Sequence, residues 1–301
     1  MRKWIPTLVL VLIFAAGVVY ASSHNFFRAS DPVPQKLMAV HREAVTGIRI
    51  EQTGGEPVEM IKQNDGWVMK LPHAYPLNSY AVDNWLNALE AATTGDIIEE
   101  QPKNPEKYGI GGQHGWNITV TGNEGAVHKL AVGSTLPSGS SSYVQLESGA
   151  VISVAQDSLS GMLLSATEFI DTTPFEWDKA HLSALEWEGT SSSWVLKRGE
   201  SGPDWTLNGQ QIKEEDASSL SDKLINVATS QQLRSTSELK KESHRFTLTV
   251  TLDEGKDPKV YQGWTTSDQA DTVWIIPPDS NWAYAVSADN VKEIEQAENR
   301  N

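Results

Sequence analysis

Apolar and polar residues alternate along most of the chain after residue 44, in short runs that end at turns rich in glycine and asparagine. A period of two predicts strands with one buried face. Asn64-Asp65-Gly66 and Asn123-Glu124-Gly125 are typical of hairpin turns. In the first half the pattern predicts strands at 47–52, 58–62, 67–69, 97–98, 116–121, 127–132, 143–146 and 151–154.

Two longer segments have helical spacing instead. Residues 80–92 form the first predicted helix, which Asn78 or Ser79 can cap. Residues 214–228 form the second, and the acidic residues at its start suit the helix dipole. Shorter helices are expected at 157–164 and after Ser287. The predicted buried faces are Val82, Trp85, Leu86 and Leu89 in the first long helix and Leu220, Leu224, Ile225 and Val227 in the second.

The order of elements repeats in the second half of the chain. Leu185 and Trp187 stand where Ile48 and Ile50 stood, and Trp205 stands where Trp67 stood. Strands at 246–252, 259–262, 273–276 and 282–286 then follow in the earlier order. The match is one of pattern and turn placement. We therefore predict an α+β fold of two tandem related units, 44–172 and 173–296, each a mainly antiparallel sheet with packed helices, before a short tail at 297–301.

The pattern of the N-terminal segment predicts that the rest of the chain is exported across a membrane. Arg2 and Lys3 precede an uncharged stretch, 4–20, which as a helix spans roughly 25 Å. We expect residues 1–21 to be a transmembrane anchor with a cytoplasmic N-terminus, because positive flanks stay inside. The alternative is a signal peptide cleaved after Ala21, which would leave a soluble periplasmic protein. Residues 22–43, with Pro32 and Pro34, are polar and are predicted to be a linker.

Composition excludes several classes of function. The net charge is −15, from 24 basic and 39 acidic residues, and the basic residues are scattered. A nucleic-acid binder needs a clustered positive surface, so we predict no nucleic-acid partner. The absence of cysteine removes disulfides and thiolate metal sites. The seven histidines show no metal-ligand spacing, and no nucleophile or phosphate-loop motif is present. We predict no catalytic residue, metal site or cofactor.

Four residues are candidates for binding. Tyr108 and His114 lie in a glycine-rich loop, 108–115, that has no counterpart in the second half. Trp264 and Trp282 flank predicted turns and are expected to be the exposed members of the eleven tryptophans. Those expected to fill the two cores are Trp67, Trp85, Trp116, Trp187, Trp194, Trp205 and Trp274.

Several of these features together resemble a family of bacterial proteins, the domain of unknown function DUF4340. They are the leader, the first strand pair, the Asp65-Gly66-Trp67 turn with its following helix, and the loop Lys107-Tyr108-Gly109-Ile110. The resemblance covers roughly 45–294. It implies a single-pass inner-membrane protein with a periplasmic part, often encoded beside an ABC transporter of the gliding-motility or ABC-2 type. The expected function is that of a non-enzymatic binding or scaffold protein for such a transporter complex. The alternative is an envelope polysaccharide-binding protein or hydrolase that uses an aromatic groove between the units.

Overall fold

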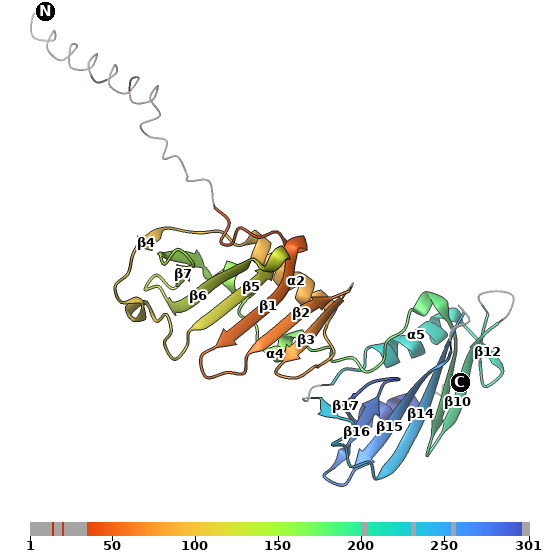
Figure 1. Cartoon of the computed structure of the whole chain (residues 1–301). Helices are drawn as coiled ribbons and strands as arrows, with labels where there is room; N and C mark the ends of the chain where they lie inside the picture. The colour runs from red at the N-terminus through yellow and green to blue at the C-terminus, as the bar shows by residue number, and fades with distance from the viewer. Residues whose placement is uncertain are drawn as a thin grey trace, which may run out of the picture.

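The computed structural model describes residues 35–64, 66–199, 204–229, 233–253 and 257–296, together with Phe14 and Tyr20. Two mainly antiparallel β-sheets follow each other along the chain, and helices pack on them (Figure 1). The predicted α+β class with two sheets is confirmed. The predicted anchor at 1–21 and tail at 297–301 lie outside the described residues, apart from Phe14 and Tyr20. Within the described ranges no helix is both long enough and apolar enough to span a membrane.

The first sheet has the strand order β3-β2-β1-β5-β6-β7-β8-β4. Its strands are β1 (Val45–Gln52), β2 (Val58–Gln63), β3 (Gly66–Leu71), β4 (Ile97–Glu99), β5 (Trp116–Gly122), β6 (Val127–Thr135), β7 (Ser141–Leu146) and β8 (Val151–Ala155). The helices of this half are η1 (Arg42–Ala44), α2 (Ser79–Ala91), η2 (Pro105–Tyr108), η3 (Asn123–Gly125), α3 (Gln156–Ser160) and α4 (Ala166–Phe169). The Asn78 side chain caps α2 by accepting hydrogen bonds from the main-chain N–H groups of Tyr80 and Ala81.

The second sheet has the order β12-β11-β10-β9-β14-β15-β16-β17-β13. Its strands are β9 (Leu182–Gly189), β10 (Ser193–Arg198), β11 (Trp205–Leu207), β12 (Gln210–Ile212), β13 (Arg234–Ser235), β14 (Ser243–Leu252), β15 (Lys259–Thr266), β16 (Gln269–Ile276) and β17 (Trp282–Ser287). The helices are η4 (Lys179–His181), α5 (Glu214–Ile225) and α6 (Ala288–Glu295). Helix α5 ends three residues before the predicted end at 228.

The two sheets have the same strand order once β12 is set aside. Strands β9, β10 and β11 take the places of β1, β2 and β3, while β13 takes the place of β4. The register agrees with the predicted correspondence: Trp67 lies opposite Lys62, as Trp205 lies opposite Arg198. The hairpin strand β12 was not predicted. Its turn, Asn208-Gly209, has positive φ at both residues, which Asn and Gly tolerate.

Each sheet buries a hydrophobic core beneath its helices, and the first core also includes Leu233 and Tyr284 of the second half. In the first core the predicted face of α2 is buried, and in the second Leu224 of α5 is fully covered. Ile225 is only half-buried, so the predicted face of the second helix is slightly too wide. Leu37 and Met38, within the predicted linker, are 5% and 6% exposed and belong to the first core.

Five of the seven tryptophans predicted for the cores are buried: Trp85, Trp187, Trp194, Trp205 and Trp274. The expectation was wrong for Trp67 and Trp116, which are half-buried and pack at the border of the first core. Trp67 lies in the edge strand β3, and Trp116 is the first residue of β5. Residues at such positions have neighbours on fewer sides than residues at the centre of a sheet.

Candidate binding groove between the two sheets

A groove of about 610 Å³ lies where the loop after β3 meets the β13–β17 edge of the second sheet. The two halves of the chain both contribute to its walls. The lining residues are His73, Tyr75, Leu233, Arg234, Ser235, Glu238, Trp274 and Trp282. Trp282, one of the four predicted binding residues, is among them.

The first wall comes from the proline-bounded loop 72–76. This loop turns the Tyr75 ring inward, where it is 5% exposed, and leaves His73 exposed. The ring centroids of Tyr75 and Trp282 are 4.4 Å apart, and those of His73 and Tyr75 are 5.5 Å apart. The indole N–H of Trp282 donates to the main-chain oxygen of Ala74 over 2.9 Å. One aromatic cluster therefore forms the joint and one wall of the groove.

The second wall comes from β13 and β16. The Arg234 guanidinium lies 4.3 Å from the centroid of the Trp274 ring, and its Nη1 lies 3.1 Å from Oδ2 of Asp268. Trp274 is 1% exposed, and its indole N–H has no hydrogen-bond partner among the described residues. The ring and the carboxylate both favour this position of the guanidinium. This wall therefore presents a guanidinium whose charge is offset by Asp268.

The groove has an apolar floor and a polar rim. Leu233 and Tyr75 are buried, whereas the side chains of His73 and Glu238 are exposed. Such a surface offers mainly polar groups to a ligand, and the half-buried ring of Trp282 is its accessible apolar part. Glu238 is the one carboxylate among the lining residues, and glycoside hydrolysis ordinarily needs a pair. The arrangement is suited to binding.

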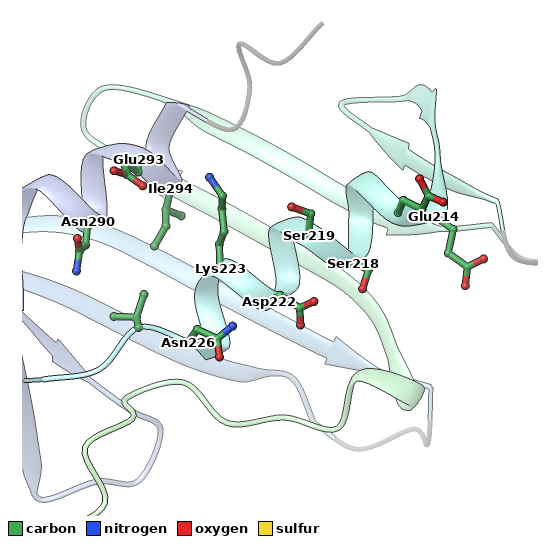
Figure 2. Close-up of a pocket in the computed structure, with 11 residues that line it drawn as sticks. Glu214, Ser218, Ser219, Asp222, Lys223, Asn226, Asn290, Glu293 and Ile294 are labelled. Atoms are coloured by element: carbon green, nitrogen blue, oxygen red, sulfur yellow. The ribbon is translucent and has the colours of Figure 1, made fainter.

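A larger hollow of about 880 Å³ lies between α5 and α6 (Figure 2). Figure 2 shows polar side chains of α5, among them Ser218 and Asp222, beside the hollow, with Asn290 and Glu293 on α6. Glu214 and Glu215 stand in the first turn of α5, where the helix dipole favours acidic groups. Despite its volume, this hollow has no aromatic side chain among its lining residues, and it is a surface depression.

The other three predicted binding residues lie away from the groove. His114 is exposed in its loop. Trp264 is half-buried in β15, where its ring meets His244 edge-on at 5.0 Å. The Tyr108 hydroxyl donates to Oε2 of Glu99 over 2.5 Å, and Lys107 Nζ lies 2.6 Å from the same oxygen. Both contacts lower the pKa of Glu99, the Lys107 contact more strongly.

The glycine-rich loop around Tyr108 is packed tightly onto β6. Gly109 has a φ of 73°, and a Cβ there would lie 2.0 Å from Oγ of Ser134. A Cβ on Gly133 would lie 2.2 Å from the main-chain oxygen of Tyr108. The glycines therefore allow the loop and the strand to approach closely. This close packing accounts for the motif without a ligand.

Sequence reasoning did not predict His73, Tyr75, Arg234 or Glu238 as lining residues. The sequence offered one signal. His73 and Tyr75 lie between Pro72 and Pro76, and two prolines this close together predict a rigid loop after the strand. Among the described residues, no group of three or more His, Asp or Glu side chains could hold a metal ion.

The fold and the groove define an α+β protein in which two antiparallel sheets meet at an aromatic joint. The family model for the domain of unknown function DUF4340 matches residues 67–245, more than half of the chain, and the chain belongs to this family. The match begins at Trp67 in β3 and ends in β14, within the wider range predicted for the resemblance. Searches for curated relatives and for similar solved structures gave no match.

Proposed function

We propose that this protein is a non-enzymatic binding subunit, anchored in the bacterial inner membrane by residues 1–21, whose periplasmic part serves an ABC-type transporter complex. We place its partner-binding site in the groove between the sheets. The observation that carries the proposal is the groove itself: a buried aromatic floor and a polar rim, built from both halves of the chain. The transporter as partner comes from the family resemblance.

The groove suits a short polypeptide segment of a partner subunit. An apolar side chain of the segment would rest against the half-buried ring of Trp282. The polar groups of the segment would meet Ser235 and Glu238 at the rim, beside the Arg234 guanidinium that pairs with Asp268. Because the lining residues belong to both sheets, a bound segment would also hold the two halves in one orientation. This combination is suited to a scaffold in a membrane complex.

The test is cross-linked co-purification from native membranes with the full-length chain. Glu238→Trp places a large side chain at the rim of the groove, and Glu215→Trp is the matched control beside the α5–α6 hollow, since both glutamates are exposed. We expect Glu238→Trp to lower recovery of ABC-type subunits about tenfold, the effect of losing about 1.4 kcal/mol of binding free energy. We expect Glu215→Trp to match the wild type.

Two outcomes would contradict the proposal. If a folded Glu238→Trp variant recovers the same subunits as the wild type, the groove is not the site. If the wild type recovers no ABC-type subunit, the transporter is not the partner. The anchor has its own test in N-terminal sequencing: a mature chain that begins at Ser22 makes the protein soluble and periplasmic.

The second candidate function is binding of envelope polysaccharide, which the ring cluster of His73, Tyr75 and Trp282 favours. Sugars stack on exposed aromatic faces, but Tyr75 is buried and Trp282 is half-buried, so the platform is small. Titration of the protein with purified envelope polysaccharide separates the candidates. Saturable binding that Trp282→Phe weakens would favour the polysaccharide, and assay of released sugar would show whether the protein hydrolyses it.

We also infer that the two units descend from one duplicated unit. The support is the shared strand order and the shared register around Trp67 and Trp205. A duplication explains why each unit can bury a core of its own. The groove, in contrast, exists only where the two units meet.

A further inference from the structure

Edge strand β4 exposes two isoleucines on the first unit. Ile97 is 63% exposed and Ile98 is 39% exposed. Singly exposed apolar residues are common, but here two adjacent ones lie on an edge strand, whose free backbone groups can pair with another chain. We refer to Ile97 and Ile98 as the β4 patch. It lies outside the groove between the sheets.

The second unit shows what an equivalent edge looks like when it is covered. Strand β13 borders β17 as β4 borders β8. Ile97 pairs with Ile152 of β8. In the second unit Arg234 pairs with Ala283, and extending this register by one residue puts Leu233 at the corresponding place, beside Tyr284 of β17. Leu233 is only 6% exposed. Equivalent positions on the two edges thus differ about tenfold in exposure.

The first unit is what covers Leu233. Both Leu233 and Tyr284 belong to the hydrophobic core of the first unit, which also includes Tyr75 of the loop 72–76. The covering element is therefore an irregular loop that inserts an aromatic side chain. The same kind of surface on the first unit, the β4 patch, has no such cover among the described residues.

A second copy of this chain is poorly suited to cover the patch. A head-to-tail copy would have to offer the part of its second unit that corresponds to the loop 72–76. There the chain instead forms the turn Asn208-Gly209 and strand β12. That hairpin adds the edge strand β12 to the second sheet, in the way that terminal repeats cap the ends of repeat proteins. The unlike ends point to a different protein at the β4 patch.

We propose that the β4 patch is a docking surface for a second protein, which presents a loop with an aromatic side chain in the way that the loop 72–76 does. Exposed carboxylates of Asp96 and Glu100 flank the patch, so a loop that also carries basic residues fits best. The N–H of Thr94 donates to the main-chain oxygen of Gln35 over 2.8 Å, so Gln35 lies beside the segment that leads into β4. With the anchor proposed above, the partner is the extracytoplasmic loop of a membrane protein.

The test places a photo-cross-linking amino acid at position 97 of the full-length chain in native membranes. Position 260 is the matched control, because Val260 is 40% exposed on β15 of the second unit. We expect an adduct from position 97 only, mapped by mass spectrometry to an aromatic loop of one membrane protein. Ile98→Asp should reduce its yield at least about tenfold, since it puts a charge into the apolar contact.

Several results would overturn the proposal. Cross-links to residues 21–34 of the same chain would mean that its own N-terminal segment covers the patch. An adduct of doubled mass would indicate a second copy, and adducts with lipid would indicate the membrane surface. Failure to form any adduct with a folded protein would show that the patch is free. The cross-linking is repeated in the Glu238→Trp variant, which changes the groove and leaves the β4 patch intact. An adduct that persists there shows that docking at the patch does not depend on the groove.

Discussion

The indole N–H of Trp282, in strand β17, donates to the main-chain oxygen of Ala74, 208 residues earlier in the chain. The bond crosses the joint between the two units, and the Trp282 ring packs on Tyr75 at 4.4 Å. Leu233 and Tyr284 of the second half are also buried in the first core. The joint is therefore a packed contact with a directional bond at its edge, and it should couple the unfolding of the two units.

Replacing Trp282 tests this coupling. Trp282→Phe keeps a ring and loses the hydrogen bond, and we expect it to cost about 1 kcal/mol. Trp282→Ala also removes the packing and should cost about 2–3 kcal/mol, so that one thermal transition splits into two. Scanning calorimetry measures both effects. Trp264→Phe is the control, because its indole N–H bonds to Gln262 within β15. An unsplit transition in a destabilised Trp282→Ala protein would show that the joint does not couple the units.

The corresponding tryptophans Trp67 and Trp205 should differ in their contribution to stability. Trp205 is 8% exposed, with the Arg198 guanidinium 5.9 Å from its ring centroid, whereas Trp67 is half-buried at a sheet edge. We expect Trp205→Ala to lower the free energy of unfolding by about 3–5 kcal/mol and Trp67→Ala by about 1–2 kcal/mol. Denaturant unfolding followed by circular dichroism measures both. Equal losses would mean that the greater exposure of Trp67 does not reduce its contribution to stability.

The strands and long helices could be predicted because each buries one face, and burial leaves a periodic trace in the sequence. Ile48 and Ile50 alternate with polar residues, and both are 1% exposed. The predicted face of α2 is the buried face, since helical spacing places Val82, Trp85 and Leu89 together. The duplication could be seen for the same reason, because the pattern repeats even where residue identities differ.

Two of the short strands leave too little pattern to predict. Strands β12 and β13 have three and two residues, so alternation cannot be recognised in them. The turn Asn208-Gly209 is a strong hairpin signal, but no strand was predicted directly after it. Leu37 and Met38 are adjacent apolar residues in a polar segment, and only tertiary packing explains their burial.

The groove could be predicted only in part, for a related reason. Trp282 was identified because it flanks a turn. Tyr75 and Leu233 line the same groove through a contact between units, and no local pattern encodes which loop of one unit meets which edge of the other. Tyr108 and His114 drew attention because their loop has no counterpart, yet close packing of Gly109 on Ser134 explains that loop.

The pKa of Glu99 should depend on Lys107. Lys107 Nζ and the Tyr108 hydroxyl both contact Oε2 of Glu99, and the ammonium contact contributes most to its lowered pKa. A lowered carboxyl pKa adds stability at higher pH, and this contribution is lost as pH falls through the folded-state value. We expect Lys107→Met to raise the pKa of Glu99 toward its ordinary value, and Tyr108→Phe to raise it less. Carbon-detected NMR titration measures both. The reverse ranking would show that the hydroxyl dominates.

Alkaline pH should weaken the second unit through Tyr261. This side chain is 2% exposed, its hydroxyl donates to the main-chain oxygen of Glu176 over 2.9 Å, and burial raises its pKa to about 12. The ordinary tyrosine pKa is about 10. Because the folded state holds the proton more tightly, stability is complete below about pH 10 and falls as pH rises to about 12, by up to about 3 kcal/mol.

Tyr261→Phe separates the hydroxyl from the ring in this prediction. The variant should lose about 1 kcal/mol near neutral pH with the missing hydrogen bond, and should lose less additional stability than the wild type at high pH. Burial also raises the pKa of Tyr284, so part of the alkaline loss should persist until Tyr284→Phe is added. Tyr80→Phe, at a position 79% exposed, controls for the removal of one hydroxyl. Urea unfolding across the alkaline range, with tyrosinate absorbance followed in parallel, measures these effects. An alkaline loss that is identical in Tyr261→Phe and the wild type would mean that ionisation of Tyr261 is not its cause.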